Sequence, residues 1–486
     1  MSKNLKQSTI NAASWNFSNM LVGQVRTFIV STILARLLMP EDFGLLGMAM
    51  VFASLTDSFV DFGFGNAVIQ KQKVSKLQLS TVFWINMLMA SFLGLTMYFS
   101  SPLVAAYFEM PKLEAITQLM SLTFLIKGLS TLQNALYKKD LDFKTPFKIG
   151  LFSGIVSGVL GIVLAYAGYG VYSLIYSQIA GWVMGTALIW YFSTWKPSFM
   201  FSLKAVKSLW SFGYKYSLSI FIDSIFSRLD TLIIGKLFSA ATLGLFYKAQ
   251  SLNKLVVQYA FSSFSGVLFP SLSKLAHDKE KLREVLVRIL HLVCFTTFLF
   301  SGLMFVNAKS VIVILLTEKW LGSVPIFKIL ALFSFIYTIP TILNSPILSI
   351  GESGAILKVE IYKKSLYLLA IPVAIYYGLY AYILATVLAA IIGIILNLGL
   401  VQKFFNYRIK EFLKLFLNYV IIFIFLIGID YLFGDFEMNH FLSIILKTSI
   451  YVTFYMLLNA FVFKSKGFNE FKNIAQGLLI KLKIIK

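Results

Sequence analysis

The sequence predicts an all-helical protein that crosses a membrane many times. Of its 486 residues, 58% are hydrophobic and 13% are charged, whereas about 25% of residues are charged in soluble domains. The mean hydropathy is +0.81. Apolar stretches of about twenty residues, each long enough to cross a hydrocarbon core of about 30 Å, recur along the chain. So few charges cannot cover a surface that faces water throughout.

Turn residues and charged clusters divide these apolar stretches into about fourteen predicted membrane spans. The run 310–316 is too short to cross a bilayer, and we expect it in an outer loop. The predicted spans are residues 12–38, 43–65, 80–100, 113–136, 147–167, 170–193, 209–237, 242–269, 285–307, 324–350, 362–378, 380–402, 412–433 and 440–463.

The placement of basic residues predicts the orientation of these spans. Loops after even-numbered spans, together with the two termini, hold 30 of the 43 lysines and arginines, including Lys358, Lys363 and Lys364. The opposite loops hold four basic residues. Cytoplasmic loops of membrane proteins are enriched in lysine and arginine, so both termini are predicted to be cytoplasmic. The first span lacks a cleavage site for a signal peptide, and we expect it to be retained.

The chain matches itself at an offset of 200 residues. The match includes Arg36 opposite Lys236, and both segments are predicted to end one helix and begin the next. Five positions are identical: Ile33/Ile233, Leu37/Leu237, Gly44/Gly244, Leu45/Leu245 and Ala49/Ala249. Six spans per repeat is an even number, which predicts two parallel lobes related by an axis along the membrane normal. We therefore expect lobes at 1–208 and 209–402, two extra spans at 403–463, and an amphipathic basic tail at 464–486 on the inner leaflet.

Several charged residues fall inside predicted spans, where a lipid-facing charge costs about 2.5–3.5 kcal/mol. Residues near span ends can reach the interface, whereas those near the middle should line water or protein. The candidates for a substrate cavity are Arg26, Lys127, Lys254, Arg228, Asn19 and Asp223. Each could instead belong to a buried structural ion pair.

Three of these candidates belong to polar stripes at helical spacing. In the first span the stripe is Asn16, Asn19, Gly23 and Arg26; in the seventh it is Ser219, Asp223 and Asp230. A cavity rich in arginine and lysine selects an anion, and guanidinium groups grip phosphate bidentately. Asp57 and Asp61 could couple transport to an ion, although pairing with loop lysines is the simpler interpretation.

Other features of the sequence favour structural roles or exclude whole classes of function. Gly150, Gly154 and Gly158 form a small-residue pattern that favours close helix packing. The single Cys294 excludes an internal disulfide, and the three scattered histidines predict neither a zinc site nor any cofactor. The net charge of +22 is spread over short cytoplasmic segments, which indicates membrane topology and anionic lipid as a partner rather than a nucleic acid.

Five short segments, in order between about residues 10 and 275, resemble the Wzx-like O-antigen and exopolysaccharide flippase family. This family of polysaccharide transporters belongs to the multidrug/oligosaccharidyl-lipid/polysaccharide exporter (MOP) superfamily. The segments are Leu34–Gly44 (LARLLMPEDFG), Asp61–Gln70 (DFGFGNAVIQ), Ser80–Trp84 (STVFW), Arg228–Asp230 with Ile234-Gly235, and Leu268–Ser273 (LFPSLS).

The resemblance implies a bundle like those of MATE and MurJ transporters, working by alternating access in a bacterial cytoplasmic membrane. It implies transport of undecaprenyl-diphosphate-linked oligosaccharide, with a polysaccharide polymerase and glycosyltransferases as candidate partners. Two alternatives remain: a drug/cation antiporter of the same superfamily, and a membrane-embedded polysaccharide polymerase. Because no loop exceeds about thirty residues, there is little room for catalysis, and we expect no enzyme.

Overall fold

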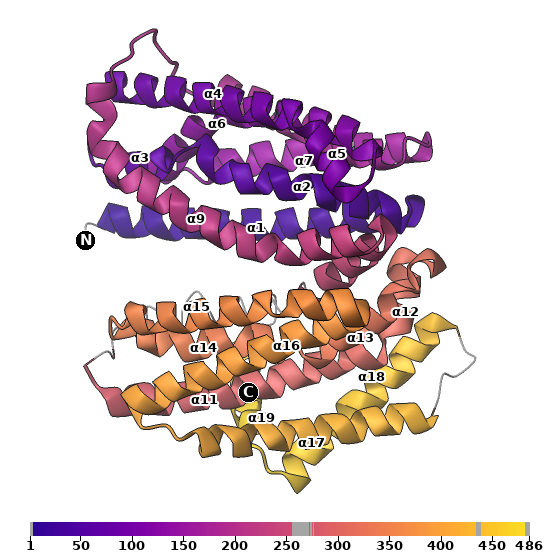
Figure 1. Cartoon of the computed structure of the whole chain (residues 1–486). Helices are drawn as coiled ribbons and strands as arrows, with labels where there is room; N and C mark the ends of the chain where they lie inside the picture. The colour runs from indigo at the N-terminus through magenta and orange to yellow at the C-terminus, as the bar shows by residue number, and fades with distance from the viewer. Residues whose placement is uncertain (1–2, 255–271, 273–274, 276, 434–438, 482–486) are drawn as a thin grey trace. The chain divides into compact units, whose positions relative to one another are not determined.

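The computed structural model describes residues 3–254, 272, 275, 277–433 and 439–481, and every regular element among them is a helix (Figure 1). The contact pattern divides the chain into a first unit, Met1–Gly244, and a second unit, Leu245–Lys486. Nine helices of the described chain are long and apolar enough to cross a membrane by length and composition. The prediction of an all-helical polytopic membrane protein is therefore confirmed, while the number fourteen stays a prediction.

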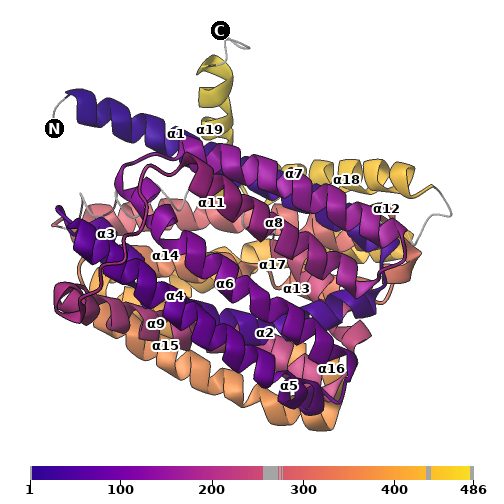
Figure 2. The ribbon, with the colours of Figure 1, turned by 90° about the horizontal axis from the view of Figure 1, so that it is seen from above.

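The first unit consists of long helices joined by short turns. Gly63, with a φ of 69°, makes the turn between α2 and α3, a left-handed conformation that suits glycine. Figure 2 shows α7 and α8 side by side, and the two helices pack along their length. The helices are α1 (Lys3–Leu37), α2 (Pro40–Val60), α3 (Phe64–Gln70), α4 (Lys76–Phe99), α5 (Ser101–Phe108), α6 (Lys112–Lys139), α7 (Lys144–Tyr166), α8 (Val171–Phe192) and α9 (Leu203–Leu237).

The 200-residue repeat corresponds to matching local structure. The helix α9 ends at Leu237, 200 positions after α1 ends at Leu37. Helix resumes at Pro40 after α1 and at Ala240 after α9. In both turns the equivalent first and fourth positions are hydrogen-bonded, although in opposite directions. The Met39 N–H donates to Asp42 at 3.0 Å, and the Thr242 N–H donates to the Ser239 hydroxyl at 3.1 Å. The prediction that each repeat segment ends one helix and begins another is confirmed.

The second unit is organised around α11, which packs against α13, α14, α17, α18 and α19. Its regular elements are the α-helices α11 (Lys279–Val306), α12 (Ala308–Leu316), α13 (Ser323–Leu332), α14 (Phe335–Ser349), α15 (Ser353–Leu368), α16 (Ala370–Phe405), α17 (Ile409–Phe433), α18 (His440–Leu457) and α19 (Lys466–Lys481), the short 3₁₀ helix η1 (Glu318–Trp320) and the π-helical turn η2 (Leu458–Val462). Residues 310–316, expected in a loop, form most of α12.

The lysines expected in a loop after residue 350 lie instead in α15. This helix begins at Ser353, so Lys358, Lys363 and Lys364 are helical. The Lys363 ammonium forms an ion pair with Glu360 at 2.6 Å, one turn earlier. The charge of Lys363 is compensated by a residue of the same helix. A segment rich in lysine, which the sequence analysis assigned to a loop, can therefore be helical.

Three tyrosine hydroxyls attach α17 and α18 to successive turns of α11. Tyr419 donates to the carbonyl of His291 at 3.4 Å, Tyr451 to Phe298 at 3.1 Å, and Tyr455 to Phe295 at 2.8 Å. Tyr455 is fully buried. A buried tyrosine combines apolar contact area with a satisfied hydroxyl, so these two helices are held by polar as well as apolar contacts.

The first two turns of α19 pack on α11 within the second unit. Phe468 and Phe471 contact Phe295, with ring centroids 6.0 and 5.3 Å apart. Glu470 pairs with Arg288 of α11 at 2.6 Å. The apolar side chains at the start of the tail therefore pack on the protein's own core. The predicted contact of the tail with the inner leaflet stays a prediction.

Candidate functional site

Arg26 and Asn19 of α1 lie against the glycine-rich face of α7. The Arg26 guanidinium donates to the Gly150 carbonyl and occupies the space that a Cβ on Gly154 would fill. A Cβ on Gly150 would lie 3.5 Å from the Asn19 side-chain oxygen. The predicted role of these glycines in packing is confirmed. They also let an arginine lie directly on the helix backbone.

This arrangement presents Arg26 with a fixed orientation in the first unit. A guanidinium carries five N–H donors in a planar fork, and the Gly150 carbonyl accepts from one nitrogen. The side chain is only partly buried. A positioned, partly accessible guanidinium is suited to bind phosphate oxygens.

Lys127 of α6 forms a cation–π contact with Trp182 of α8. Its ammonium lies 5.0 Å from the centre of the indole ring, and Trp182 is itself exposed. Sequence reasoning identified Lys127 and missed Trp182. The available signal was a tryptophan between Gly181 and Gly185, which bring α8 close to Ser157 and Ser153 of α7.

The other cavity candidates lie on α9 and on the helical residues after it. Asp223 is exposed and Arg228 is partly buried on α9, whereas the side chain of Ser219 lies outside the described residues. Lys254, in the second unit, is exposed and bonds to Gln250 at 3.2 Å. The structure therefore brings Asn19 and Arg26 together along α7, and it assigns Lys127 a partner that the sequence did not indicate.

Asp61 caps the short helix α3 at the junction with α2. Its carboxylate accepts from the Gly65 N–H at 2.8 and 3.0 Å and from the Asn86 amide at 3.1 Å. At the other end of α3, Lys139 donates to the carbonyls of Val68 and Lys71. A carboxylate at a helix N-terminus and a lysine at its C-terminus both oppose the helix dipole.

These contacts give Asp61 a structural role, and its proposed part in ion coupling stays a hypothesis. The side chain of Asp57, the second ion-coupling candidate, lies outside the described residues. In the part of the chain that the structure describes, no group of three or more histidine, cysteine, aspartate or glutamate side chains could hold a metal ion.

Replacing Asp61 separates the structural role from the coupling role. Asp61→Ala leaves two donors without their acceptor and is expected to lower the free energy of unfolding by about 1–3 kcal/mol. Asp61→Asn retains an oxygen for the Gly65 N–H and should be milder. Thermal unfolding in detergent measures both, with the exposed Asp140→Ala as control. Normal stability of Asp61→Asn combined with lost transport would instead support ion coupling.

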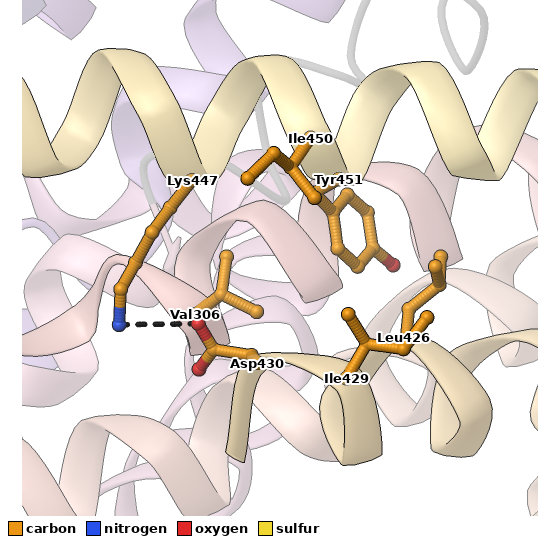
Figure 3. Close-up of a pocket in the computed structure, with 7 residues that line it drawn as sticks. All are labelled: Val306, Leu426, Ile429, Asp430, Lys447, Ile450 and Tyr451. Atoms are coloured by element: carbon orange, nitrogen blue, oxygen red, sulfur yellow. Dashed lines mark ion pairs between the residues drawn. The ribbon is translucent and has the colours of Figure 1, made fainter. Parts of the chain in front are cut away.

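An ion pair inside the predicted spans joins α17 to α18. The Lys447 ammonium lies 3.1 Å from the Asp430 carboxylate, and their side chains are only 10% and 20% exposed (Figure 3). The pair borders a small cavity of about 20 Å³ with an otherwise apolar lining, made of Val306, Leu426, Ile429, Ile450 and Tyr451. The sequence placed both charges in spans without pairing them.

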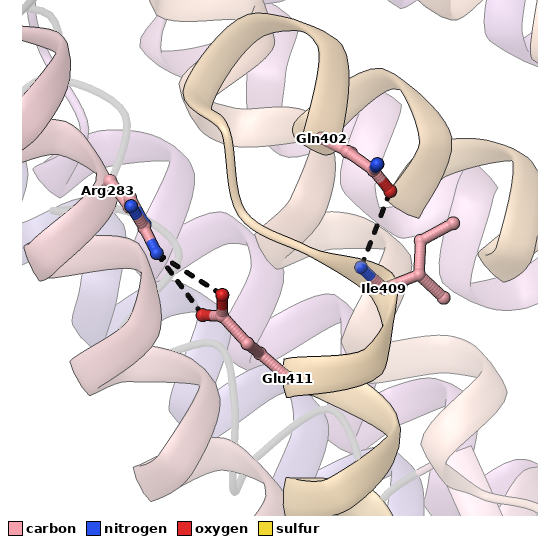
Figure 4. Close-up of polar contacts among 4 residues, drawn as sticks. All are labelled: Arg283, Gln402, Ile409 and Glu411. Atoms are coloured by element: carbon pink, nitrogen blue, oxygen red, sulfur yellow. Dashed lines mark hydrogen bonds and ion pairs between the residues drawn. The ribbon is translucent and has the colours of Figure 1, made fainter.

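A larger, charged hollow of about 540 Å³ lies between α11, α17 and α19. Its arginines are engaged by glutamates: Arg283 contacts Glu411 at 3.2 and 3.4 Å (Figure 4), and Arg288 contacts Glu470. With four glutamates, two arginines and one lysine in its lining, this hollow lacks the basic excess expected of an anion site.

Comparisons with known proteins agree with the fold and with the resemblance found in the sequence. The family model described as "Polysaccharide biosynthesis protein" matches residues 33–325. The lipopolysaccharide biosynthesis protein WzxC of Escherichia coli is 26% identical over 76% of this chain and 75% of its own. The teichuronic acid biosynthesis protein TuaB of Bacillus subtilis is 28% identical over 62% of each chain.

Solved structures with the same fold are transporters. The lipid II flippase MurJ aligns with a TM-score of 0.73 at 17% identity, over 93% of this chain and 99% of its own. A multidrug resistance transporter of the MATE family and MOP superfamily aligns with a TM-score of 0.60 at 12% identity, over 78% of this chain and 95% of its own. The expected fold like those of MATE and MurJ transporters is therefore confirmed.

Proposed function

Because the chain belongs to the polysaccharide biosynthesis protein family, a family of Wzx-like flippases, we propose that it carries undecaprenyl-diphosphate-linked oligosaccharide across the bacterial cytoplasmic membrane. The protein is a membrane transporter of polysaccharide biosynthesis and not an enzyme. Relatives named for lipopolysaccharide and for teichuronic acid synthesis differ in their polymer, so the proposal names the carrier lipid and not the sugar.

The proposed mechanism is alternating access between two parallel lobes of six spans, residues 1–208 and 209–402. Two further spans at 403–463 and the basic tail at 464–486 complete the arrangement, with both termini in the cytoplasm. The helix ends at Leu37 of α1 and Leu237 of α9, which are 200 residues apart, support the repeat on which the two lobes rest. In parallel repeats, the substrate site lies between the repeats near the bilayer midplane.

The diphosphate is the part of the cargo that the protein must grip, because the lipid tail can remain in the bilayer. Arg26 carries this proposal, since its guanidinium is oriented by the α7 backbone and remains partly accessible. Lys127, Arg228 and Lys254 are the further cationic candidates, with Asn19 and Asp223 as polar neighbours of the same helices. Trp182, held by Lys127, adds an exposed aromatic face.

The second candidate function is export of organic cations, which the fold shared with a MATE transporter permits. A cation exporter needs a cavity with net acidic character, whereas the candidates here are mostly basic. The basic side chains therefore favour an anionic cargo.

Deletion of the gene tests the proposed function in cells. In a strain without a redundant transporter, loss of the protein should remove the surface polysaccharide and leave lipid-linked oligosaccharide on the cytoplasmic leaflet. The leaflet is identified by access of a glycan-cleaving enzyme added to right-side-out or inverted vesicles. Unchanged surface polysaccharide contradicts the proposal. Drug sensitivity without a polysaccharide defect favours the antiporter.

A further inference from the structure

Two glycines at equivalent positions of the repeat meet each other's helices within the first unit. A Cβ on Gly44 would lie 2.6 Å from the carbonyl carbon of Ala240, and a Cβ on Gly244 would lie 2.7 Å from the carbonyl carbon of Pro40. Pro40 and Ala240 are themselves 200 residues apart. The contact is therefore reciprocal, as expected where a two-fold axis passes between equivalent segments.

This crossing is tight at one point and requires glycine there. Real Cβ atoms essentially never approach another heavy atom within 3.0 Å, so neither Gly44 nor Gly244 leaves room for a side chain. One turn further along α2, a Cβ on Gly47 would meet only ordinary contacts at 3.7 and 3.9 Å. Helix backbones can come this close only at residues without side chains.

The residues around the crossing exclude water. Ala240 is 3% exposed and Leu243 is 1% exposed, while Phe43 and Leu45 of α2 are also buried. Along α1, Leu34 and Ala35 near the same end are buried, whereas Asn16 is exposed and Asn19 and Arg26 are partly exposed. The C-terminal end of α1, near the crossing, is therefore buried, whereas the polar stripe earlier in the helix is accessible.

The predicted topology places the α1–α2 turn on the outer side of the membrane. Two ion pairs lie near that turn and the end of α9, between Lys236 and Glu109 at 2.8 Å and between Lys112 and Glu41 at 3.9 Å. These exposed pairs contribute little to closure by themselves. The backbone crossing of Gly44 and Gly244 is the part of this end that can stop ions and water.

We propose that the crossing of Gly44 and Gly244 is the outer seal of the transport path, closed in this conformation and parted when cargo leaves outward. This inference rests on the proposed alternating access. Opening would part the two backbones and expose the side chains buried beside them, such as Leu243.

Access of a thiol reagent to the crossing tests the seal directly. The background carries Cys294→Ser to remove the native thiol, and Leu243→Cys places a reporter in the dry region. A membrane-impermeant maleimide is added outside intact cells. In the otherwise native chain the reporter should react slowly. Gly44→Ala or Gly244→Ala should raise its labelling rate about tenfold, because overpacking destabilises the closed contact.

Gly47→Ala is the matched control on the same helix, and it should leave labelling slow. Elution as a single folded species from size exclusion in detergent excludes misfolding as the cause of faster labelling. A reporter that labels rapidly in the native chain, or that stays protected in folded Gly44→Ala and Gly244→Ala, overturns the seal. The readout needs no cargo, so it still holds if the chain transports something other than a lipid-linked glycan.

Discussion

Arg26→Ala is expected to reduce glycan export by about 10- to 100-fold, because a hydrogen bond to a charged group contributes about 1.5–3 kcal/mol. The guanidinium is the candidate group whose orientation is fixed by backbone contacts, at Gly150 and Gly154 of α7. Arg26→Lys keeps the charge and loses the planar fork, so it should recover only part of the export. Export is measured as surface polysaccharide per molecule of transporter in a complemented deletion strain.

Gly154→Ala moves the same arginine without changing it. Its new methyl group would occupy the space that the guanidinium now fills, so Arg26 must leave the α7 backbone. We expect a loss of export in the same direction as Arg26→Ala. Arg36→Ala, which changes an exposed side chain near the C-terminal end of the same helix, is the matched control and should export normally. Full export by Arg26→Ala at normal protein level would contradict the proposed site.

Lys447→Ala is expected to lower the free energy of unfolding by about 3–5 kcal/mol. This is the usual cost when one member of a buried ion pair is removed and the other is left without a partner. Asp430 would then lose its partner between α17 and α18, in surroundings otherwise made of apolar side chains. The double variant Lys447→Met/Asp430→Leu removes both charges and fills similar volume. Its free energy of unfolding should be at least as large as that of the native chain.

Denaturation of the purified protein in mixed micelles gives the comparison. If the pair explains the loss, the double variant recovers stability that Lys447→Ala lacks. Equal destabilisation in the single and double variants would assign the effect to packing alone. Lys319→Ala, an exposed lysine outside the predicted spans, should change little.

The features that sequence reasoning predicted correctly are those set by local pattern. The repeat placed the end of α9 exactly 200 residues after that of α1 because both ends are marked by the same short motif. Glycine spacing on one face of α7 predicted a close helix neighbour. Helical periodicity also placed Asn19 and Arg26 on one face of α1, which the structure confirms through their shared contact with α7.

The features that it missed depend on pairings between distant segments. Asp61 meets Asn86 from α4, and Lys447 meets Asp430 across a turn between two helices. A hydropathy scale scores each charged residue separately, so it cannot show that a partner residue lowers the free-energy cost of burying the charge. The same limitation assigned Lys363 to a loop, although its pair with Glu360 lets α15 continue through it.

The measurement that tests the central claim most directly is flipping by the purified protein in liposomes. Undecaprenyl-diphosphate-linked oligosaccharide is placed in both leaflets, and a glycan-cleaving enzyme is added outside, with and without a membrane potential or cation gradient. The account predicts that the native protein lets the enzyme reach nearly all of the glycan, that Arg26→Ala slows this, and that an organic cation is not moved. Cleavage that stops at the outer-leaflet fraction under every condition, as in protein-free liposomes, would contradict it.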